Sequence, residues 1–115
     1  MIKDKLYVYN ILESIKLIED YSGKLGLKEF SKSELTKDAV SKRFEEIGEN
    51  ARNISIKTKK NYPKVPWKEL VENRNFLSHA YRFMNDERLW NAIKKNLPEL
   101  KKQMKKIMED LNNAK

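Results

Sequence analysis

His79 is the residue of this chain best suited to proton transfer. It is the only histidine among 115 residues, and an ordinary imidazole pKa of about 6.5 lets it take and give protons near neutral pH. Asn75 precedes it by four residues, so in a helix the amide would lie on the same face and could orient the ring. A lone histidine near a helix end is also a common surface or capping residue. His79 is therefore a candidate general acid or base, and its context must decide.

Arg74 stands where an apolar side chain is expected. Spacings of three and four residues place on one helix face Trp67, Leu70, Arg74, Leu77 and Tyr81. A guanidinium keeps its charge, so at the edge of a core it needs a carboxylate, a phosphate or carbonyl groups. Glu46 and Glu49 on the preceding helix are candidate partners. Because Arg74 and His79 diverge by about 140° on an ideal helix, a shared site needs a bent helix end or a second subunit.

The elements that must position these residues are predicted to be helices. The first is expected from Lys5 to Tyr21, ending before Ser22, Gly23 and Gly26. Its expected core face consists of Leu6, Tyr9, Leu12, Ile15 (or Lys16) and Ile18. Ser31 or Ser33 is predicted to cap a second, long helix. Its core face is expected to hold Val40, Phe44, Ile47, Ala51 and Ile54, with Gly48 allowing close approach of a helix or a ligand.

Prolines and caps mark the remaining helices. Pro66 suits the first position of a third helix that starts near Trp67. Asn85 is expected to cap a fourth helix with acidic residues in its first turn, and Pro98 to kink or restart that helix. The last stretch buries a face formed by Leu100, Met104, Ile107 and Leu111. The sequence therefore predicts an all-α, antiparallel bundle of four or five helices in a single domain covering residues 1–115.

Charge favours a polyanionic partner. Lys and Arg number 25 against 17 Asp and Glu, for a formal net charge of +8. The lysines of the last helix (Lys101, Lys102, Lys105 and Lys106) fit either an RNA track or a merely solvated face. The absence of cysteine excludes disulfides, thiolate zinc sites and cysteine nucleophiles. The charged first residues predict a cytoplasmic protein without a signal peptide or a membrane segment.

Four segments together resemble the HepT-like toxins of the HEPN superfamily. Residues 74–81 read R-x4-H-x-Y, and residues 43–49 resemble that family's R-x3-IGE stretch. Residues 62–67 resemble its YP-x-(I/V)PW turn, and residues 97–100 its LPEL helix start. The order is kept over roughly residues 38–108. Two departures are Asn50, where a small apolar residue is usual, and Ser78, where alanine is common. They bear on local packing more than on the motif.

The resemblance implies a HEPN-type homodimer whose paired motifs line a basic cleft. It implies a toxin that acts as an endoribonuclease on tRNA or mRNA and that pairs with an MntA-like nucleotidyltransferase antitoxin. Arg74 and His79 occupy the catalytic motif positions, with Asn75 and Glu49 in support. Tyr81 matches the tyrosine that such antitoxins modify with adenylate, known as AMPylation.

The chemistry of the motif agrees with metal-independent cleavage. Breaking RNA without a metal needs a base for the 2′-hydroxyl, an acid for the leaving oxygen and a cation for the phosphorane. His79 would move the proton, Arg74 would clamp the phosphate, and no metal or other cofactor is expected. The main alternative is a non-catalytic HEPN subunit that binds substrate for a nucleotidyltransferase. A purely structural reading takes Arg74 as a buried ion pair and His79 as a cap.

Overall fold

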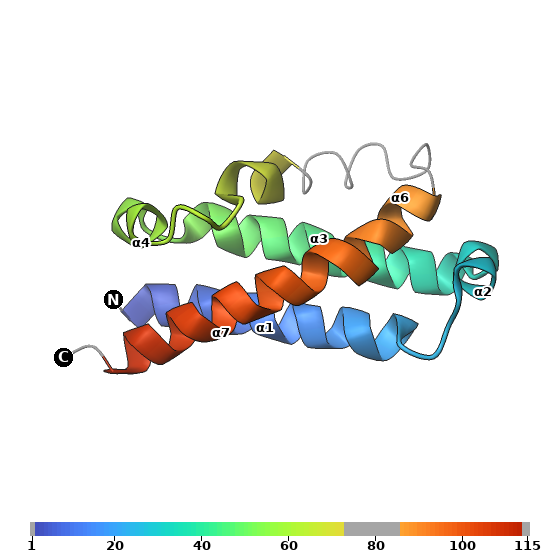
Figure 1. Ribbon diagram of the computed structural model, residues 1–115, viewed down its shortest axis with the longest axis horizontal. Coiled ribbons are helices and arrows are strands. Elements are labelled where there is room, and N and C mark those ends of the chain that lie inside the picture. Colours follow the sequence, from blue (N-terminus) through green and yellow to red (C-terminus); the bar gives the residue numbers. More distant parts are fainter. Residues whose placement is uncertain (1, 73–85, 114–115) are drawn as a thin grey trace.

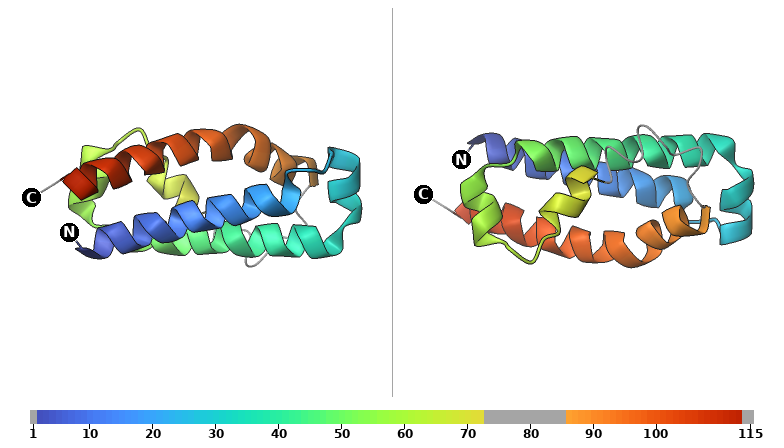
Figure 2. Two further views of the ribbon diagram at one scale, coloured as in Figure 1. Left: turned by 90° about the horizontal axis from the view of Figure 1, so that it is seen from below. Right: turned by 90° about the horizontal axis from the view of Figure 1, so that it is seen from above.

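Three long helices form the body of the protein. The computed structural model describes residues 2–72 and 86–113, and all regular structure in these ranges is helical. Helix α1 (Ile2–Ser22) packs along both α3 (Glu34–Asn53) and α7 (Leu97–Asn113). Both α3 and α7 run opposite to α1, so the two ends of the chain lie at the same end of the bundle (Figures 1 and 2). The predicted all-α antiparallel bundle is confirmed.

Two short helices were not predicted. Helices α2 (Leu27–Lys32) and α4 (Ile56–Asn61) have six residues each, which is too short for a periodic pattern or for stability in isolation. Packing and capping stabilise them instead. Phe30 of α2 is fully buried against Trp90, with ring centroids 5.1 Å apart, and the Ser55 side chain caps α4 by accepting a hydrogen bond from the backbone N–H of Thr58.

The predicted core face of α1 was partly wrong. Ile15 and Ile18 are fully buried as expected, but Leu6 and Tyr9 are 56% and 53% exposed. The buried face continues toward the N-terminus through Ile11, Val8 and Asp4. Apolar residues occur on several faces of this helix, so spacing alone left its rotation open. Contacts with α3, α7 and the start of α4 determine which face is buried.

Asp4 is a buried carboxylate that ties α1 to α4. It accepts hydrogen bonds from the Ser55 backbone N–H at 3.0 Å, from the Ser55 hydroxyl at 2.7 Å and from the Thr58 hydroxyl at 2.6 Å. Burial raises the pKa of Asp4, but these hydrogen bonds outweigh burial and hold the pKa below its ordinary value. Asp4 therefore anchors the segment that leads to the 62–67 turn.

Replacing Asp4 by asparagine should lower the free energy of unfolding by about 2 kcal/mol at neutral pH, because a buried, charge-assisted network loses its carboxylate. Since the folded state lowers the pKa of Asp4, its stabilisation is complete above the unfolded pKa and disappears as pH falls through the folded one. Urea titrations should show a constant difference from wild type between about pH 5 and 7, shrinking below about pH 4. Asp20→Asn, an exposed change on α1, is the control; a pH-independent Asp4 effect would contradict the assignment.

Helix α3 follows its predicted pattern closely. Ser33 is the N-cap, and its hydroxyl accepts a hydrogen bond from the Thr36 backbone N–H. The core face is confirmed: Phe44 is partly buried, and the fully or nearly fully buried members are Val40, Ile47, Ala51 and Ile54. Asn50 is also buried in this face; its amide donates to the Glu46 carbonyl at 2.8 Å and accepts from Asn10 of α1 at 3.1 Å. The polar side chain that departs from the family pattern is thus satisfied by one hydrogen bond within α3 and one from α1.

Helix α7 is reached through an irregular but unbroken helical stretch. Helix α6 (Asp86–Asn91) leads into the π-helical segment η2 (Ala92–Asn96), and η2 leads into α7. Pro98 has no N–H and its ring crowds the carbonyl four residues earlier, so an α-helical bond cannot form there. The wider π turn, closed by the Leu97 N–H to the Ala92 carbonyl, accommodates it. Pro98 thus perturbs this helix as predicted, without breaking it.

Candidate functional site

The R-x3-IGE stretch lies in the middle of α3. Ile47 and Gly48 are buried, whereas Arg43 and Glu49 are half-buried at the edge of the helix. The Glu49 carboxylate lies 4.0 Å from the Arg52 guanidinium, one turn along the helix. Glu49 and Glu46, the two candidate partners of Arg74, lie within the described part of the chain; Glu46 is 3.4 Å from Lys42, and the position of Glu49 at the edge of the core leaves its carboxylate partly accessible.

The 62–67 turn is held by a compact set of hydrogen bonds. The Tyr62 carbonyl accepts from the Val65 backbone N–H at 3.2 Å and from the Trp67 indole N–H at 3.0 Å. Val65 is buried, and its carbonyl accepts from the Trp67 backbone N–H at 2.8 Å. Residues 67–72 are helical, and Leu70 donates to the Pro66 carbonyl at 3.0 Å. The predicted helix start near Trp67 is confirmed, with Pro66 immediately before the helix, and the turn fixes the start of the segment that leads to Arg74.

Tyr62 also fastens this turn to α7. Its phenol donates a hydrogen bond to the Asp110 carboxylate at 2.5 Å, and Lys106 lies 3.2 Å from the other carboxylate oxygen. Burial and the contact with Asp110 raise the pKa of Tyr62 to about 12. The same hydrogen bond holds the pKa of Asp110 below its ordinary value. Tyr62 is therefore a protonated structural anchor at neutral pH.

The other predicted site residues lie outside the described ranges: Arg74, Asn75, His79 and Tyr81, together with Ser78 and the predicted cap Asn85. The described flanks of that segment are both anchored. On one side, Leu70 packs on the core. On the other, Asp86 at the start of α6 lies 3.4 Å from Lys37 of α3. The predicted start of this helix, with Asp86 and Glu87 in its first turn, agrees with the structure.

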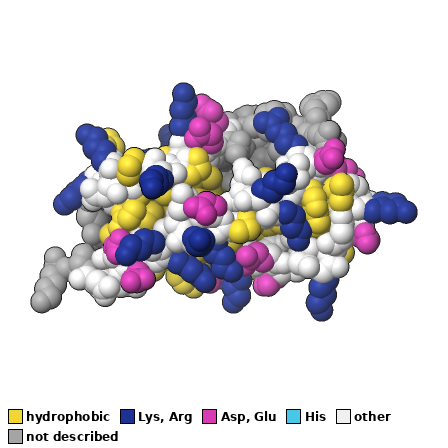
Figure 3. Space-filling view, in the orientation of Figure 1, with side chains coloured by type: hydrophobic (Ala, Val, Ile, Leu, Met, Phe, Trp, Pro, Cys, Tyr) yellow, Lys and Arg dark blue, Asp and Glu magenta, His cyan; other side chains and the backbone are white. Residues whose placement is uncertain are grey.

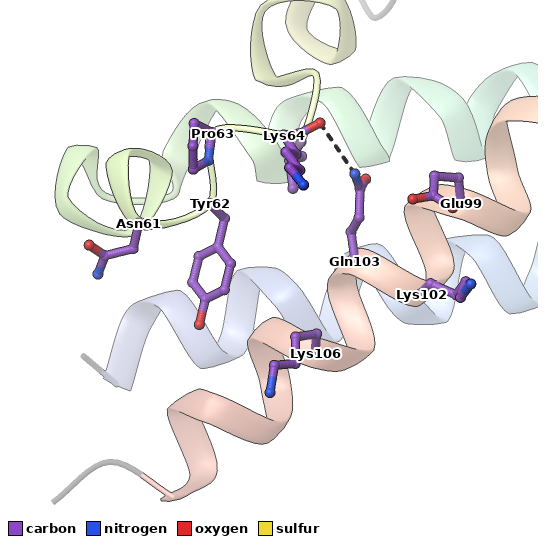
Figure 4. Close-up of a pocket in the computed structure, with 9 residues that line it drawn as sticks. Asn61, Tyr62, Pro63, Lys64, Glu99, Lys102, Gln103 and Lys106 are labelled. Atoms are coloured by element: carbon purple, nitrogen blue, oxygen red, sulfur yellow. Dashed lines mark hydrogen bonds between the residues drawn. The ribbon is translucent and has the colours of Figure 1, made fainter.

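Two neighbouring cavities open along the inner side of the 61–70 segment. The first, of about 440 Å³, lies between residues 61–65 and α7 (Figure 4). The second, of about 450 Å³, is lined by apolar residues of α3, the 67–72 helix and α7, among them Phe44, Ile47 and Leu70. Lys64, Glu99 and Gln103 border both cavities. The sequence did not predict these cavities, because they form where the 62–67 turn crosses α7.

Cations are distributed among acids on the face shown in Figure 3. Lysine and arginine side chains are spread over it with acidic side chains between them. Within the described ranges two lysines of α7 are paired, Lys101 with Glu19 at 3.0 Å and Lys106 with Asp110 at 3.2 Å. The predicted buried face of this helix is confirmed, since Leu100, Met104 and Ile107 are buried and Leu111 is partly buried against the core. On this face the positive charge forms no continuous band.

Comparison with known proteins identifies the family. The family model described as "Ribonuclease HepT-like" matches residues 11–107, a span that includes all four sequence motifs. The chain belongs to the HepT-like family. The resemblance found in the sequence is thereby confirmed, and the helical bundle described above is the form that this HepT-like chain takes.

Curated relatives support this membership. A Methanocaldococcus jannaschii protein described as a gamma-glutamylcyclotransferase and candidate RNase is 40% identical over 111 residues, which are 96% of this chain and 50% of that protein. The chain thus spans half the length of that relative. A candidate ribonuclease HepT of Thermococcus cleftensis is 34% identical over 103 residues, covering 90% and 94% of the two chains. A candidate RNase of Caldanaerobacter subterraneus is 35% identical, covering 90% and 92%. No solved structure matches the chain.

None of the helices in residues 2–72 and 86–113 has the length and apolar character needed to cross a bilayer. In the same ranges, histidine and acidic side chains form no group of three or more that could hold a metal ion.

Proposed function

We propose that this HepT-like chain is a metal-independent endoribonuclease that acts as the toxin of a toxin–antitoxin pair. The observation that carries the proposal is the intact R-x4-H-x-Y sequence at residues 74–81, which lies inside the span matched by the ribonuclease HepT-like family. The RNase names of the relatives support the same activity. They favour it over a non-catalytic HEPN subunit that serves a nucleotidyltransferase.

The proposed chemistry assigns one task to each motif residue. His79 takes the proton from the attacking 2′-hydroxyl or gives one to the leaving 5′-oxygen. Arg74 holds the phosphate through its planar fork of donors and stabilises the added negative charge of the phosphorane. Asn75 orients the imidazole, and Glu49, at the accessible edge of α3, is a candidate partner for Arg74. The anchored 62–67 turn supports this assignment, because it fixes where the segment begins.

A homodimer would complete the site. Because Arg74 and His79 diverge on a regular helix, the proposal places one motif from each of two subunits in a shared basic cleft. A second histidine, from the partner copy, then supplies the missing acid or base. The proposed substrate is tRNA or mRNA, and the proposed regulator is an MntA-like nucleotidyltransferase antitoxin that adenylylates Tyr81. We place the protein in the cytoplasm, where such RNAs occur.

RNA cleavage should persist in EDTA and leave a 2′,3′-cyclic phosphate on the upstream product. The reason is that an imidazole and a guanidinium can supply proton transfer and charge stabilisation without a metal ion. Product ends can be identified by mass spectrometry of a cleaved oligoribonucleotide. The control is the same reaction with an added excess of magnesium, which should leave the product ends unchanged. Activity lost in chelator and restored by magnesium would overturn the proposed mechanism.

A further inference from the structure

The cavity between residues 61–65 and α7 has the features of a nucleotide-binding site. Its volume of about 440 Å³ falls in the range of about 300–1,000 Å³ that is typical of small-molecule sites. One wall is apolar and formed by Tyr62, Pro63 and Val65, while three lysines face it from the turn and from α7: Lys64, Lys102 and Lys106. Figure 4 shows Tyr62, Pro63 and Lys64 on the turn and Lys102 and Lys106 on α7, on the two sides of this opening.

The lysines give the cavity an excess of positive charge. Glu99 is the acidic residue among its lining residues, so three cations oppose one anion. Lys106 is paired with Asp110 at 3.2 Å. In residues 2–72 and 86–113, no carboxylate forms an ion pair with Lys64 or Lys102. These two ammonium groups therefore remain available to an anionic ligand such as a phosphate.

Gln103 adds an unsatisfied hydrogen-bond acceptor. Its Nε2 donates to the Lys64 carbonyl at 3.2 Å (Figure 4), which fixes the amide between the two cavities that it borders. Its Oε1 is buried and has no hydrogen-bond partner in the described part of the chain. A buried acceptor without a donor is costly, so a rotation of the Gln103 side chain that brings this oxygen to an N–H group of a ligand would relieve that cost.

We propose that this cavity binds one nucleotide of an RNA strand, outside the catalytic motif. Lys64 and Lys102 hold the phosphate, the Tyr62–Pro63 wall covers the base, and Gln103 accepts from an N–H of the base. The choice of ligand follows from the combination of an apolar wall, a cationic rim and an acceptor, which a nucleoside monophosphate unit matches. The inference rests on the proposed ribonuclease function for its choice of RNA as the source of that unit.

Binding of a short 2′-O-methyl oligoribonucleotide tests the site without any cleavage, because the nucleophilic hydroxyl is blocked. Fluorescence anisotropy over a range of salt concentrations gives affinity and salt dependence. Lys102→Ala should weaken binding several-fold and reduce the slope of log K against log salt by about 0.7, the value for one phosphate contact on a single strand. Lys105→Ala is the matched control, because Lys105 is an exposed lysine of α7 that does not line the cavity. Equal effects of the two variants would overturn the proposal.

A second variant tests the base contact. Gln103→Met removes the acceptor without changing charge, so it should weaken oligonucleotide binding while leaving the salt slope unchanged. In the wild type, the Gln103 side-chain amide signals in a ¹H–¹⁵N spectrum should shift on titration with the oligonucleotide. Unchanged signals together with unchanged affinity of Gln103→Met would overturn the proposed base contact and with it the site.

A titration with adenosine monophosphate (AMP), followed by the same Gln103 amide signals, shows whether the cavity binds a nucleotide within an RNA strand or a free nucleotide. Shifts of Gln103 with the oligonucleotide, whether or not AMP also causes them, support an RNA subsite. Shifts with AMP alone would make the ligand a free nucleotide and overturn the RNA assignment. Failure here is distinct from failure of the ribonuclease proposal, since the oligonucleotide is not cleaved. If the chain does cleave RNA, Lys102→Ala should raise KM and leave kcat unchanged, because the contact is present throughout the reaction.

Discussion

Replacing His79 or Arg74 by alanine should reduce RNA cleavage by roughly 10²–10⁴-fold each, the range expected for loss of a positioned acid–base group or a charge-stabilising donor. His79 is the only histidine of the chain, so no other imidazole in the same subunit can take over proton transfer. Arg74→Lys should recover little activity, because an ammonium keeps the charge but loses the bidentate fork. Cleavage of a fluorescent oligoribonucleotide measures the effect, and growth after induction measures toxicity.

The fold of the same variants must also be measured, so that a loss of cleavage is not mistaken for unfolding. Helix content by circular dichroism and mass by light scattering should match wild type, since both residues are assigned to the transition state and not to folding. Of the two substitutions, the one at Arg74 is the more prone to affect folding, because Arg74 lies on the apolar face of its predicted helix. If Arg74→Ala unfolds while Arg74→Lys folds without activity, the charge is structural and the fork is catalytic. Full cleavage by His79→Ala would remove the histidine from the mechanism.

Local signals were sufficient to predict α3 and the start of the 67–72 helix. Ser33 and Pro66 each lie within one turn of the helix start that they favour. The apolar residues from Val40 to Ile54 lie on a single face of a regular helix, so their spacing determines which face of α3 is buried. The same was true of the buried face of α7. For these elements the local helix preference and the tertiary packing agree, so the helix starts and the buried faces can be predicted from the sequence.

Tertiary contacts decide the features that were missed. The rotation of α1 depends on Asp4, whose burial is tolerable only because Ser55 and Thr58, more than fifty positions later, supply donors. The sequence did contain one sign of this rotation: Asp4 follows the same helical spacing as the buried apolar residues Val8, Ile11 and Ile15. The cavity beside Gln103 has no sequence pattern of its own, because its walls come from the 61–65 turn and from α7. The motif positions Arg74, Asn75, His79 and Tyr81 were predicted from the sequence, and their geometry remains a proposal.

The proposed adenylylation site is Tyr81, and the described part of the chain gives the surroundings of other tyrosines. Tyr62 is the other tyrosine inside the four family motifs, but its phenol donates a hydrogen bond to Asp110 at 2.5 Å. Burial and that contact raise its pKa to about 12, which makes the oxygen a poor nucleophile at neutral pH. Tyr9 and Tyr21 are exposed on α1, at 53% and 39%, but they lie outside the R-x4-H-x-Y motif. Tyr81 is the proposed acceptor because it matches the motif tyrosine that the family resemblance implies is modified.

Incubation with the cognate nucleotidyltransferase, ATP and magnesium should add the mass of one AMP, or a whole number of them, to Tyr81 and stop RNA cleavage. The phenol oxygen would attack the α-phosphorus of ATP, pyrophosphate would leave with magnesium, and the phenol proton would pass to a base of the transferase. The new phosphodiester places negative charge two residues from His79 and seven from Arg74. It would occupy the donors that an RNA phosphate needs, so inhibition would persist after the transferase has left.

Tyr81→Phe and Tyr62→Phe form the decisive pair of variants, because each removes one phenol and leaves the aromatic ring. Tyr81→Phe should cleave RNA in the presence of the active transferase and ATP, with no added mass in the peptide that contains residue 81. Tyr62→Phe should be modified and silenced like wild type, although it should unfold at a lower urea concentration because it loses the hydrogen bond to Asp110. If Tyr81→Phe is still adenylylated and silenced, Tyr81 is not the switch. Since the Tyr62 phenol is already occupied, the modified peptide should then be sought on α1, where Tyr9 and Tyr21 expose their side chains.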